Sequence, residues 1–287
     1  MDYLYHYTSV ESLALILKNK SFRLSPLSVL DDLQEERVKD SQTFGEYVFV
    51  SSWTEDDEES IPMWNMYSSM SYGIRIKMKK NPFKTYEIDK TLLLHEFHNV
   101  QLTQNIFGGY DMVFSAEKPS GYTTKFSIKN LIIPPKDFFS EKYFLYNCCP
   151  NDILIKVDYT NKNELLTPQI VNDYSIFIGK LGRHKKKCWE FQKEWRYILR
   201  FSPIGFKEIV NYPIDSLEAI YKRYCNPTKA LPFKYFYLTL EDDALGTMEI
   251  TLSPKLSERY RTIIQLLKQE YNPKMIIKNS SLSNDIR

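Results

Sequence analysis

Glycine is scarce in this sequence, with 9 residues among 287. Neither a G-x-G-x-x-G stretch nor a P-loop occurs, which argues against a glycine-rich loop as the main device for holding phosphate. The 4 cysteines form no C-x-x-C pair and no His/Cys spacing typical of zinc. We therefore expect reduced thiols, no disulfide framework and no metal.

Long apolar runs are also missing. No stretch approaches the roughly 20 apolar residues that a membrane span needs, and the opening MDYLYHYT lacks the basic and apolar regions of a signal peptide. The 38 basic and 36 acidic side chains leave a formal charge of +2, so no global field marks a nucleic-acid binder. These absences predict a cytoplasmic protein with no membrane partner, and any basic surface must be local.

What the sequence does contain favours a folded α+β protein. Hydrophobic residues make up 43% of the chain, enough for a sizeable core. We expect one domain over residues 1–278, in which residues 81–150 are the candidate for an insertion or lid. The last residues, 279–287, are expected to be a flexible tail.

Patterning predicts the main elements. LYHYTS reads as a first strand, followed by a helix capped by Thr8 with Glu11 three residues later. EYVFVSSWT, residues 46–54, predicts a central strand. In the helix expected from IPMWNMY, Met63, Trp64 and Tyr67 have helical spacing and Pro62 suits the first turn.

The second half of the chain has clear strands around an ambiguous middle. Residues 152–160 and 194–202 predict strands. Between them, residues 165–192 are expected to form a helix followed by a basic loop. An amphipathic helix is predicted over residues 255–271, because its apolar residues share one face.

A few polar residues interrupt otherwise good strands. They are His6, Ser51, Ser52, and Glu194 with Arg196. Each has an ordinary explanation: a strand histidine is more often structural, serines at a strand end are usually turn residues, and Glu194 with Arg196 can be a surface ion pair of little energetic value. Trp64 and Tyr67 at helical spacing are more often core residues than a cofactor platform.

Several widely separated segments nevertheless resemble one family. In order along the chain they are LYHYTS, VFVSSWTE, the W-x-x-Y-x5-G stretch from Trp64 to Gly73, E-W-R at 194–196, and MEITLSPKLSE. Together they resemble the bacterial domain-of-unknown-function family 2971, which in turn resembles the ADP-ribosyltransferase superfamily. The resemblance implies an α+β fold with a split β-sheet core and flanking helices.

The resemblance also implies roles for individual residues. His6 matches the first-strand residue that holds NAD through a ribose, Glu194 matches the late-strand glutamate that holds the nicotinamide ribose, and Tyr67 is our choice for the third catalytic residue. The implied NAD-binding set is His6, Thr8, Ser51, Ser52, Trp64, Tyr67 and Arg196, with Ser51 or Ser52 matching the strand serine of other branches. Gln192 belongs to a Q-x-E pattern, and with the basic run it gives the expected acceptor-binding set: Gln192, Arg183, Lys185, Lys186 and Lys187. As an alternative, the basic run is simply a solvated loop.

Chemistry supplies a reason for such a set. Breaking the nicotinamide glycosidic bond builds positive charge on the ribose, so an ionised carboxylate beside it stabilises the transition state more than the ground state. An aromatic wall orients the departing neutral ring through stacking of about 1 kcal/mol. A histidine fixes ribose hydroxyls with one ring nitrogen donating and the other accepting.

The expected function is an ADP-ribosyltransferase that cleaves NAD as its substrate and modifies a macromolecule, with RNA or DNA slightly favoured over protein. A bacterial toxin or phage-defence effector with an antitoxin partner fits that activity. Two alternatives stay open: an NAD glycohydrolase, and a non-catalytic nucleotide-binding or partner-binding module. A metal-dependent nuclease is disfavoured, because the acidic residues at 31, 32, 35 and 36 have no nearby histidine and resemble a polar helix face.

Overall fold

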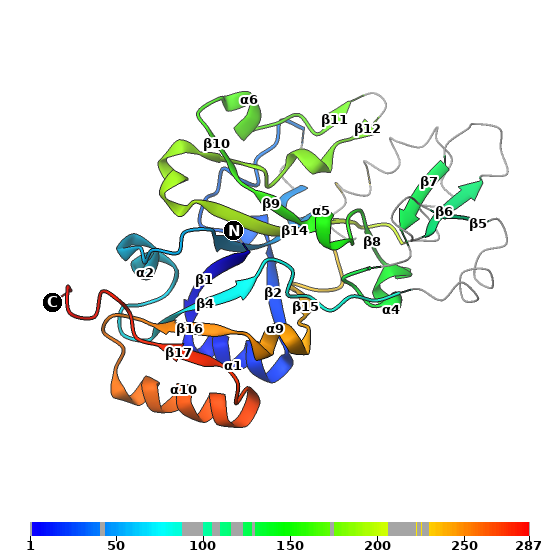
Figure 1. The fold of residues 1–287 in the computed structure, drawn as a ribbon. Coiled ribbons are helices and arrows are strands. Elements are labelled where there is room, and N and C mark those ends of the chain that lie inside the picture. The colour runs from blue at the N-terminus through cyan, green and yellow to red at the C-terminus, as the bar shows by residue number, and fades with distance from the viewer. Residues whose placement is uncertain are drawn as a thin grey trace.

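A computed structural model describes residues 2–40, 44–87, 100–104, 110–115, 123–127, 130–172, 175–205, 222, 225 and 230–286. These residues form an α+β structure around one large mixed sheet (Figure 1). The strands of that sheet are β1 (Tyr3–Ser9), β2 (Ser21–Pro26), β3 (Val48–Thr54), β4 (Gly73–Lys79), β8 (Phe144–Leu145), β9 (Leu154–Lys156), β14 (Glu194–Ser202), β15 (Phe236–Thr239), β16 (Glu249–Leu252) and β17 (Ile276–Lys278).

Smaller elements surround this sheet. The helices are α1 (Val10–Asn19), α2 (Ile61–Tyr67), α4 (Pro135–Phe138), α5 (Pro150–Ile153), α6 (Asn163–Leu166), α9 (Asp242–Gly246) and α10 (Glu258–Tyr271). The short pairs are β10 (Asp158–Thr160) with β13 (His184–Lys186), and β11 (Val171–Asn172) with β12 (Ser175–Ile176). A separate antiparallel sheet contains β5 (Val100–Gln104), β6 (Tyr110–Ser115) and β7 (Thr123–Ser127).

The large sheet splits beside β3. One edge of β3 pairs with β14 along seven registered positions, from Glu194–Thr54 to Arg200–Val48. Its other edge pairs with β2 at Val50 and Phe49 and with β1 only at Thr54. Because β1 and β2 diverge along the same strand, β1 continues into β4, β16 and β17, whereas β2 continues into β15. The split leaves polar groups of β3 without a backbone partner from β1.

Local signals explain the elements that border the split. The predicted helix after β1 is present, but its N-cap is Ser9, whose Oγ accepts the backbone N–H of Ser12, and not Thr8. The predicted helix α2 begins after Ser60, whose side chain accepts from Met63, with Pro62 in its first turn. Both helices therefore start from the side-chain hydroxyl of a serine cap.

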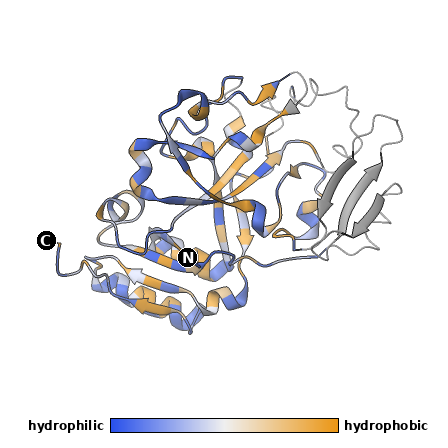
Figure 2. Ribbon diagram, turned by 45° about the horizontal axis from the view of Figure 1, so that its top comes forward, coloured by the Kyte–Doolittle hydropathy of each residue, from blue (hydrophilic) through white to orange (hydrophobic). Residues whose placement is uncertain are grey.

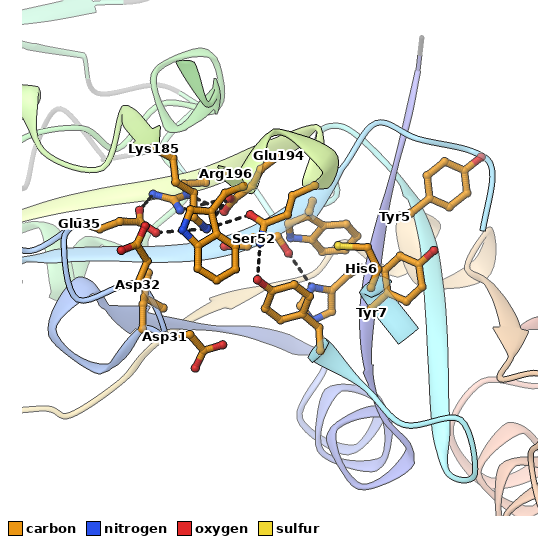
Figure 3. Close-up of a pocket in the computed structure, with 16 residues that line it drawn as sticks. Tyr5, His6, Tyr7, Asp31, Asp32, Glu35, Ser52, Lys185, Glu194 and Arg196 are labelled. Carbon is orange, nitrogen blue, oxygen red and sulfur yellow. Dashed lines mark hydrogen bonds and ion pairs between the residues drawn. The ribbon is translucent and has the colours of Figure 1, made fainter. Parts of the chain in front are cut away.

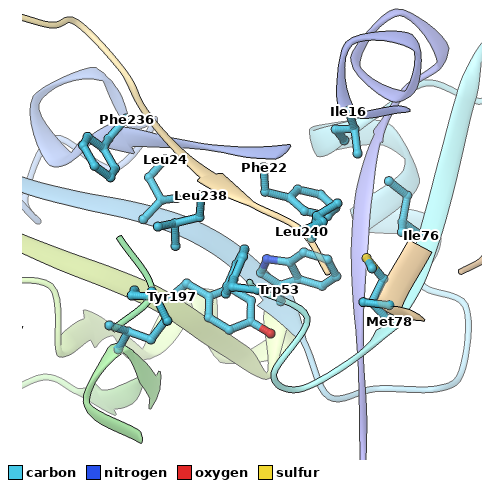
Figure 4. Packing of buried hydrophobic residues seen from close by; sticks show 14 of the residues in the cluster. Ile16, Phe22, Leu24, Trp53, Ile76, Met78, Tyr197, Phe236, Leu238 and Leu240 are labelled. Carbon is cyan, nitrogen blue, oxygen red and sulfur yellow. The ribbon is translucent and has the colours of Figure 1, made fainter. Parts of the chain in front are cut away.

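The main core fills the sheet face under α1 and α10, which contact one another. Trp53 packs edge-on against Phe22 and Tyr197 at ring-centroid distances of 5.0 and 5.7 Å (Figure 4). α10 carries hydrophobic and hydrophilic residues side by side, as Figure 2 shows, and buries Ile264 toward this core. Burial of such large side chains contributes about 1.5–3 kcal/mol each relative to exposure.

Several predicted segments differ in detail. The strand expected over 152–160 is broken by buried Val157 into β9 and β10, and α5 takes its first residues. The described residues of the range 165–192, namely 165–172 and 175–192, hold no long helix: they form the end of α6, β11, β12, two 3-10 helices and β13. The basic run is thus strand β13 and its flanks, not a loop. Much of the expected insertion at 81–150 lies outside the described residues.

The C-terminal segment is held against the body of the molecule where a flexible tail was predicted. Glu59 accepts hydrogen bonds from the Ser280 hydroxyl at 2.6 Å and from the backbone N–H of Ser281 at 2.7 Å. Leu282 packs against the small cluster of Tyr7 and Trp64. Within the described part of the chain, every helix is too short or too polar to cross a bilayer.

Candidate functional site

A cavity lies where β1 leaves β3 (Figure 3). Its walls come from β1, β3, β14, α2, β13, the 3-10 helix before β14, and segment 30–35. Its lining residues are Tyr5, His6, Tyr7, Leu30, Asp31, Asp32, Glu35, Ser52, Trp53, Met63, Tyr67, Lys185, Trp189, Gln192, Glu194 and Arg196. Residues 5–67 and residues 185–196, which are far apart in the sequence, therefore meet at the split in the sheet.

His6 bridges the split. Its Nδ1 lies 2.8 Å from the backbone oxygen of Ser52. Because a carbonyl only accepts, Nδ1 carries the proton in this bond. Burial lowers the pKa of His6, and the nearby Arg23 lowers it further, against the raising effect of the Ser52 bond. The neutral imidazole thus has an unprotonated Nε2, which no described residue hydrogen-bonds.

Glu194 sits in a buried ion network. Its Oε1 accepts from Arg196 Nε at 2.6 Å, and its Oε2 accepts from Arg196 Nη2 and from Lys185 Nζ, both at 3.1 Å. Arg196 also donates to Glu35, and Lys185 Nζ lies 3.2 Å from Glu35 Oε1. Each of the two cations therefore contacts both carboxylates, and the net charge of the network is zero.

The network fixes the ionisation of Glu194. Glu194 is 3% exposed and Arg196 is fully buried. Burial by itself raises the pKa of the Glu194 carboxyl, but the charges of Arg196 and Lys185 outweigh it and hold that pKa well below its usual range. Glu194 is consequently ionised at neutral pH.

The strand entry positions this carboxylate. Lys193, the residue before β14, has φ 44° and ψ 50°, a left-handed conformation that turns the chain sharply from the 3-10 helix into the strand. The Glu194 backbone N–H then donates to the Tyr159 hydroxyl at 2.9 Å, and its carbonyl accepts from Val157 at 2.9 Å. Both main-chain groups of Glu194 are thereby anchored on β10 and the segment before it.

Tyr67 and Gln192 join α2 to the network. Gln192, 3% exposed, accepts from Lys185 Nζ at 2.9 Å and donates to the Tyr67 hydroxyl. Burial raises the pKa of Tyr67, and the negative charges of Glu194, Asp31 and Glu35 raise it further, so the phenol stays protonated. The end of α2 thus presents an aromatic ring and a hydroxyl to the cavity.

The structure brings seven of the expected site residues together. They are His6, Ser52, Tyr67, Lys185, Gln192, Glu194 and Arg196. Arg196 was expected to bind NAD. Its guanidinium is committed to Glu194, Glu35 and the Gly182 carbonyl, so it serves the carboxylates.

Three expected NAD-binding residues do not line the cavity. Thr8 is buried on β1, and Ser51 accepts the Trp53 indole N–H at 3.1 Å. Trp64 is fully buried, packs edge-on against Tyr7 at 4.9 Å and donates to Glu59, so it is a core residue. Ser52 lines the cavity and Ser51 does not, because successive strand residues point to opposite faces of the sheet.

The basic run divides in the same way. Lys185 is 6% exposed and points into the ion network, whereas Arg183, Lys186 and Lys187 are exposed and lie outside the cavity. Lys185 was expected to bind an acceptor, but its ammonium group is taken by Glu35, Gln192 and Glu194. Lys186 follows Lys185 on β13 and so points to the opposite face of the strand, whereas Arg183 and Lys187 lie outside β13.

Sequence reasoning missed the acidic segment. Glu35 is 6% exposed and contacts both buried cations, and Asp31 and Asp32 line the same cavity. The segment was expected to be a polar helix face, but it forms turns. A second carboxylate is needed here because Arg196 and Lys185 are both buried. The local sequence does not reveal that burial.

The arrangement favours binding of a neutral hydroxyl-rich group beside an ionised carboxylate. His6 Nε2 offers an acceptor, Glu194 offers negative charge, and the Tyr67 ring offers an aromatic surface. Among the described residues, no three His, Cys, Asp or Glu side chains are placed to hold a metal ion. Searches of family models, curated proteins and solved structures found no match to this chain.

Proposed function

We propose that this protein is an ADP-ribosyltransferase that cleaves NAD and transfers ADP-ribose to a macromolecular acceptor. The observation that supports it is the meeting of His6 on β1 and Glu194 on β14 in one cavity at the split of the sheet, with Tyr67 on its wall. A split sheet and these three residues are what the resemblance of the sequence implies.

Glu194 supplies the catalytic charge in this proposal. As the bond between the ribose and nicotinamide breaks, positive charge develops on the ribose ring. The ionised Glu194 carboxylate, hydrogen-bonded to the nicotinamide ribose, stabilises that charge more than it stabilises bound NAD. Its fixed position in the ion network means that it needs no reorganisation during the reaction.

His6 acts as the ribose clamp. Its Nδ1–H is held by the Ser52 carbonyl, so the free Nε2 accepts a hydrogen bond from a ribose hydroxyl. Tyr67 packs on the nicotinamide ring and orients it as a leaving group. In this proposal His6 holds the adenosine-side ribose, while Tyr67 holds the nicotinamide ring beside the Glu194 carboxylate.

A second candidate, a nucleotide-binding module without turnover, has one observation in its favour. Both Glu194 oxygens already accept hydrogen bonds from Arg196 and Lys185. A carboxylate so fully bonded is also what a purely structural ion network contains.

One pair of measurements separates the two candidates. Purified protein is incubated with NAD and nicotinamide is quantified by chromatography, while calorimetry measures the binding of ADP-ribose. The transferase proposal predicts both binding and nicotinamide release. Binding without release favours the module, and the absence of both contradicts the two candidates together.

A further inference from the structure

A second pocket lies on the other side of β13 from the cavity. It has a volume of about 460 Å³, within the range of small-molecule sites. Lys185 of β13 lines the cavity and His184 lines this pocket, because successive strand residues point to opposite faces. The lining residues of the second pocket are Asp158, Phe177, Gly179, Lys180, Arg183 and His184, none of which lines the cavity. The two places for a ligand are therefore separate.

Positive charge prevails around the second pocket. Its lining holds two cations, Lys180 and Arg183, and one carboxylate, Asp158. Lys186 adds a third cation, because it lies on the same face of β13 as His184. Within the described part of the chain, none of these three cations has a carboxylate partner. Helix α6, which contacts β13, brings one acidic residue and is capped by a lysine, so it leaves this balance unchanged.

A buried arginine behind the pocket adds a charge that no anion balances. Arg200 on β14 is 9% exposed, and its guanidinium donates only to the carbonyls of Gly179 and Leu181 among the described residues. Its Nε is buried and has no hydrogen-bond partner there. Burial, and then the nearby charge of Arg183, lower the pKa of Arg200 to about 10. Since buried charges are normally paired, an anion beside Arg183 would relieve this excess of positive charge.

An aromatic ring and an open stretch of backbone lie beside these cations. Phe177 is 42% exposed, and Lys180 Nζ lies 5.1 Å from the centroid of its ring. A side chain at Gly179 would meet no atom within 4 Å, so a ligand can approach the backbone there. Exposed aromatic rings beside positive charge are what proteins use to stack bases and hold the backbone phosphates of single-stranded nucleic acids.

We infer that the second pocket binds a nucleotide unit, with its phosphate at Lys180 and Arg183 and its base against Phe177. The inference does not rest on the proposed function, because no residue of the cavity takes part. Free nucleotides and single-stranded nucleic acids both offer this chemistry. In a strand, Lys186 would meet a neighbouring phosphate.

The test measures binding of a short, fluorescently labelled oligothymidylate by anisotropy and of thymidine monophosphate by calorimetry. Phe177→Ala should weaken binding of the strand about tenfold through lost stacking. Arg183→Gln should also weaken it, and should reduce the salt dependence of log K by about 0.7, the effect of one phosphate contact. Binding of both probes identifies a site for free nucleotides, and binding of the strand alone identifies a site for nucleic acid; either result supports the inference.

Two matched controls keep the test specific. Phe191 is also 42% exposed but lies outside both pockets, and Arg259 is an exposed arginine on α10. Phe191→Ala and Arg259→Gln should bind the strand as wild type does, and circular dichroism verifies that each variant folds. The inference is overturned if wild type binds neither probe, or if Phe177→Ala and Phe191→Ala bind equally. Loss of binding in Tyr67→Ala but not in Phe177→Ala would place the ligand in the cavity and also overturn it.

Discussion

At the scale of single residues, His6 and Glu194 are both buried but carry different charges. His6 is stable in the fold as a neutral group, whereas Glu194 is stable as a charged one. The difference follows from their partners: a backbone carbonyl for His6, and two cations for Glu194. The charge state of each residue can be tested by a substitution that removes one of the two interacting groups.

His6 predicts a pH dependence of stability. Its folded pKa lies below the usual 6.5, so between that value and 6.5 the unfolded chain binds more protons and stability rises with pH. The contribution is fully present above pH 6.5 and is lost as pH falls toward the folded pKa. Urea unfolding of wild type and His6→Phe at pH 7.5 and 5.5 should show a smaller pH effect in the variant.

His6→Phe also removes the donor to the Ser52 carbonyl, which should cost about 1–3 kcal/mol at pH 7.5. An equal pH effect in both proteins would assign the titration to other groups.

Two buried arginines on β14 form a matched pair. Arg196 contacts two carboxylates, whereas the Arg200 guanidinium hydrogen-bonds, among the described residues, only the backbone carbonyls of Gly179 and Leu181, each at 3.4 Å. Burial lowers the pKa of Arg200 to about 10. Arg196→Met should therefore destabilise the protein by about 3–5 kcal/mol, because it leaves Glu35 and Glu194 with one cation.

Arg200→Met should cost much less, since the residue has no described carboxylate partner. Urea unfolding at pH 7.5 measures both changes. A larger loss for Arg200→Met than for Arg196→Met would contradict the ion-network description.

At the scale of elements, α2 depends on the C-terminal segment. Glu59 receives the Trp64 indole N–H of α2 at 3.1 Å as well as the Ser280 hydroxyl. Since α2 carries Tyr67 into the cavity, the segment indirectly supports the aromatic wall. A chain ended after Asn279 should lose about 1–2 kcal/mol of unfolding free energy through these hydrogen bonds.

Hydrogen exchange provides the local readout for that truncation. Amides of α2 should exchange faster in the shortened chain, whereas amides of α10 should not change. Unchanged exchange in α2 would show that Glu59 and the segment do not support the helix.

Across the whole molecule, sequence patterns predicted the helices and strands better than the contacts between them. β1, β3, α2, β14 and α10 follow from alternation, caps and amphipathic spacing, which are local signals. The break of residues 152–160 at Val157 was missed, because it reflects pairing with β14 and the Glu194 carbonyl, which are distant in sequence.

The candidate site shows the same limit. Glu194 and His6 were singled out as polar residues in apolar strands, and both line the cavity. The burial of Lys185 and Glu35 was missed, because it depends on contacts between segments about 150 residues apart. A basic run and an acidic run, read separately, predict two solvated surfaces; together they form one ion network.

In the proposed reaction, Glu194 is the group that stabilises the positive charge on the ribose as the glycosidic bond breaks. The direct measurement is nicotinamide release from NAD by wild type, Glu194→Gln and Glu35→Gln. Glu35 is the matched control, because it is a buried glutamate that contacts the same two cations. Glu194→Gln should lower the rate about 100-fold or more, and Glu35→Gln should lower it less. No release by wild type, or equal loss in the two variants, would contradict the account.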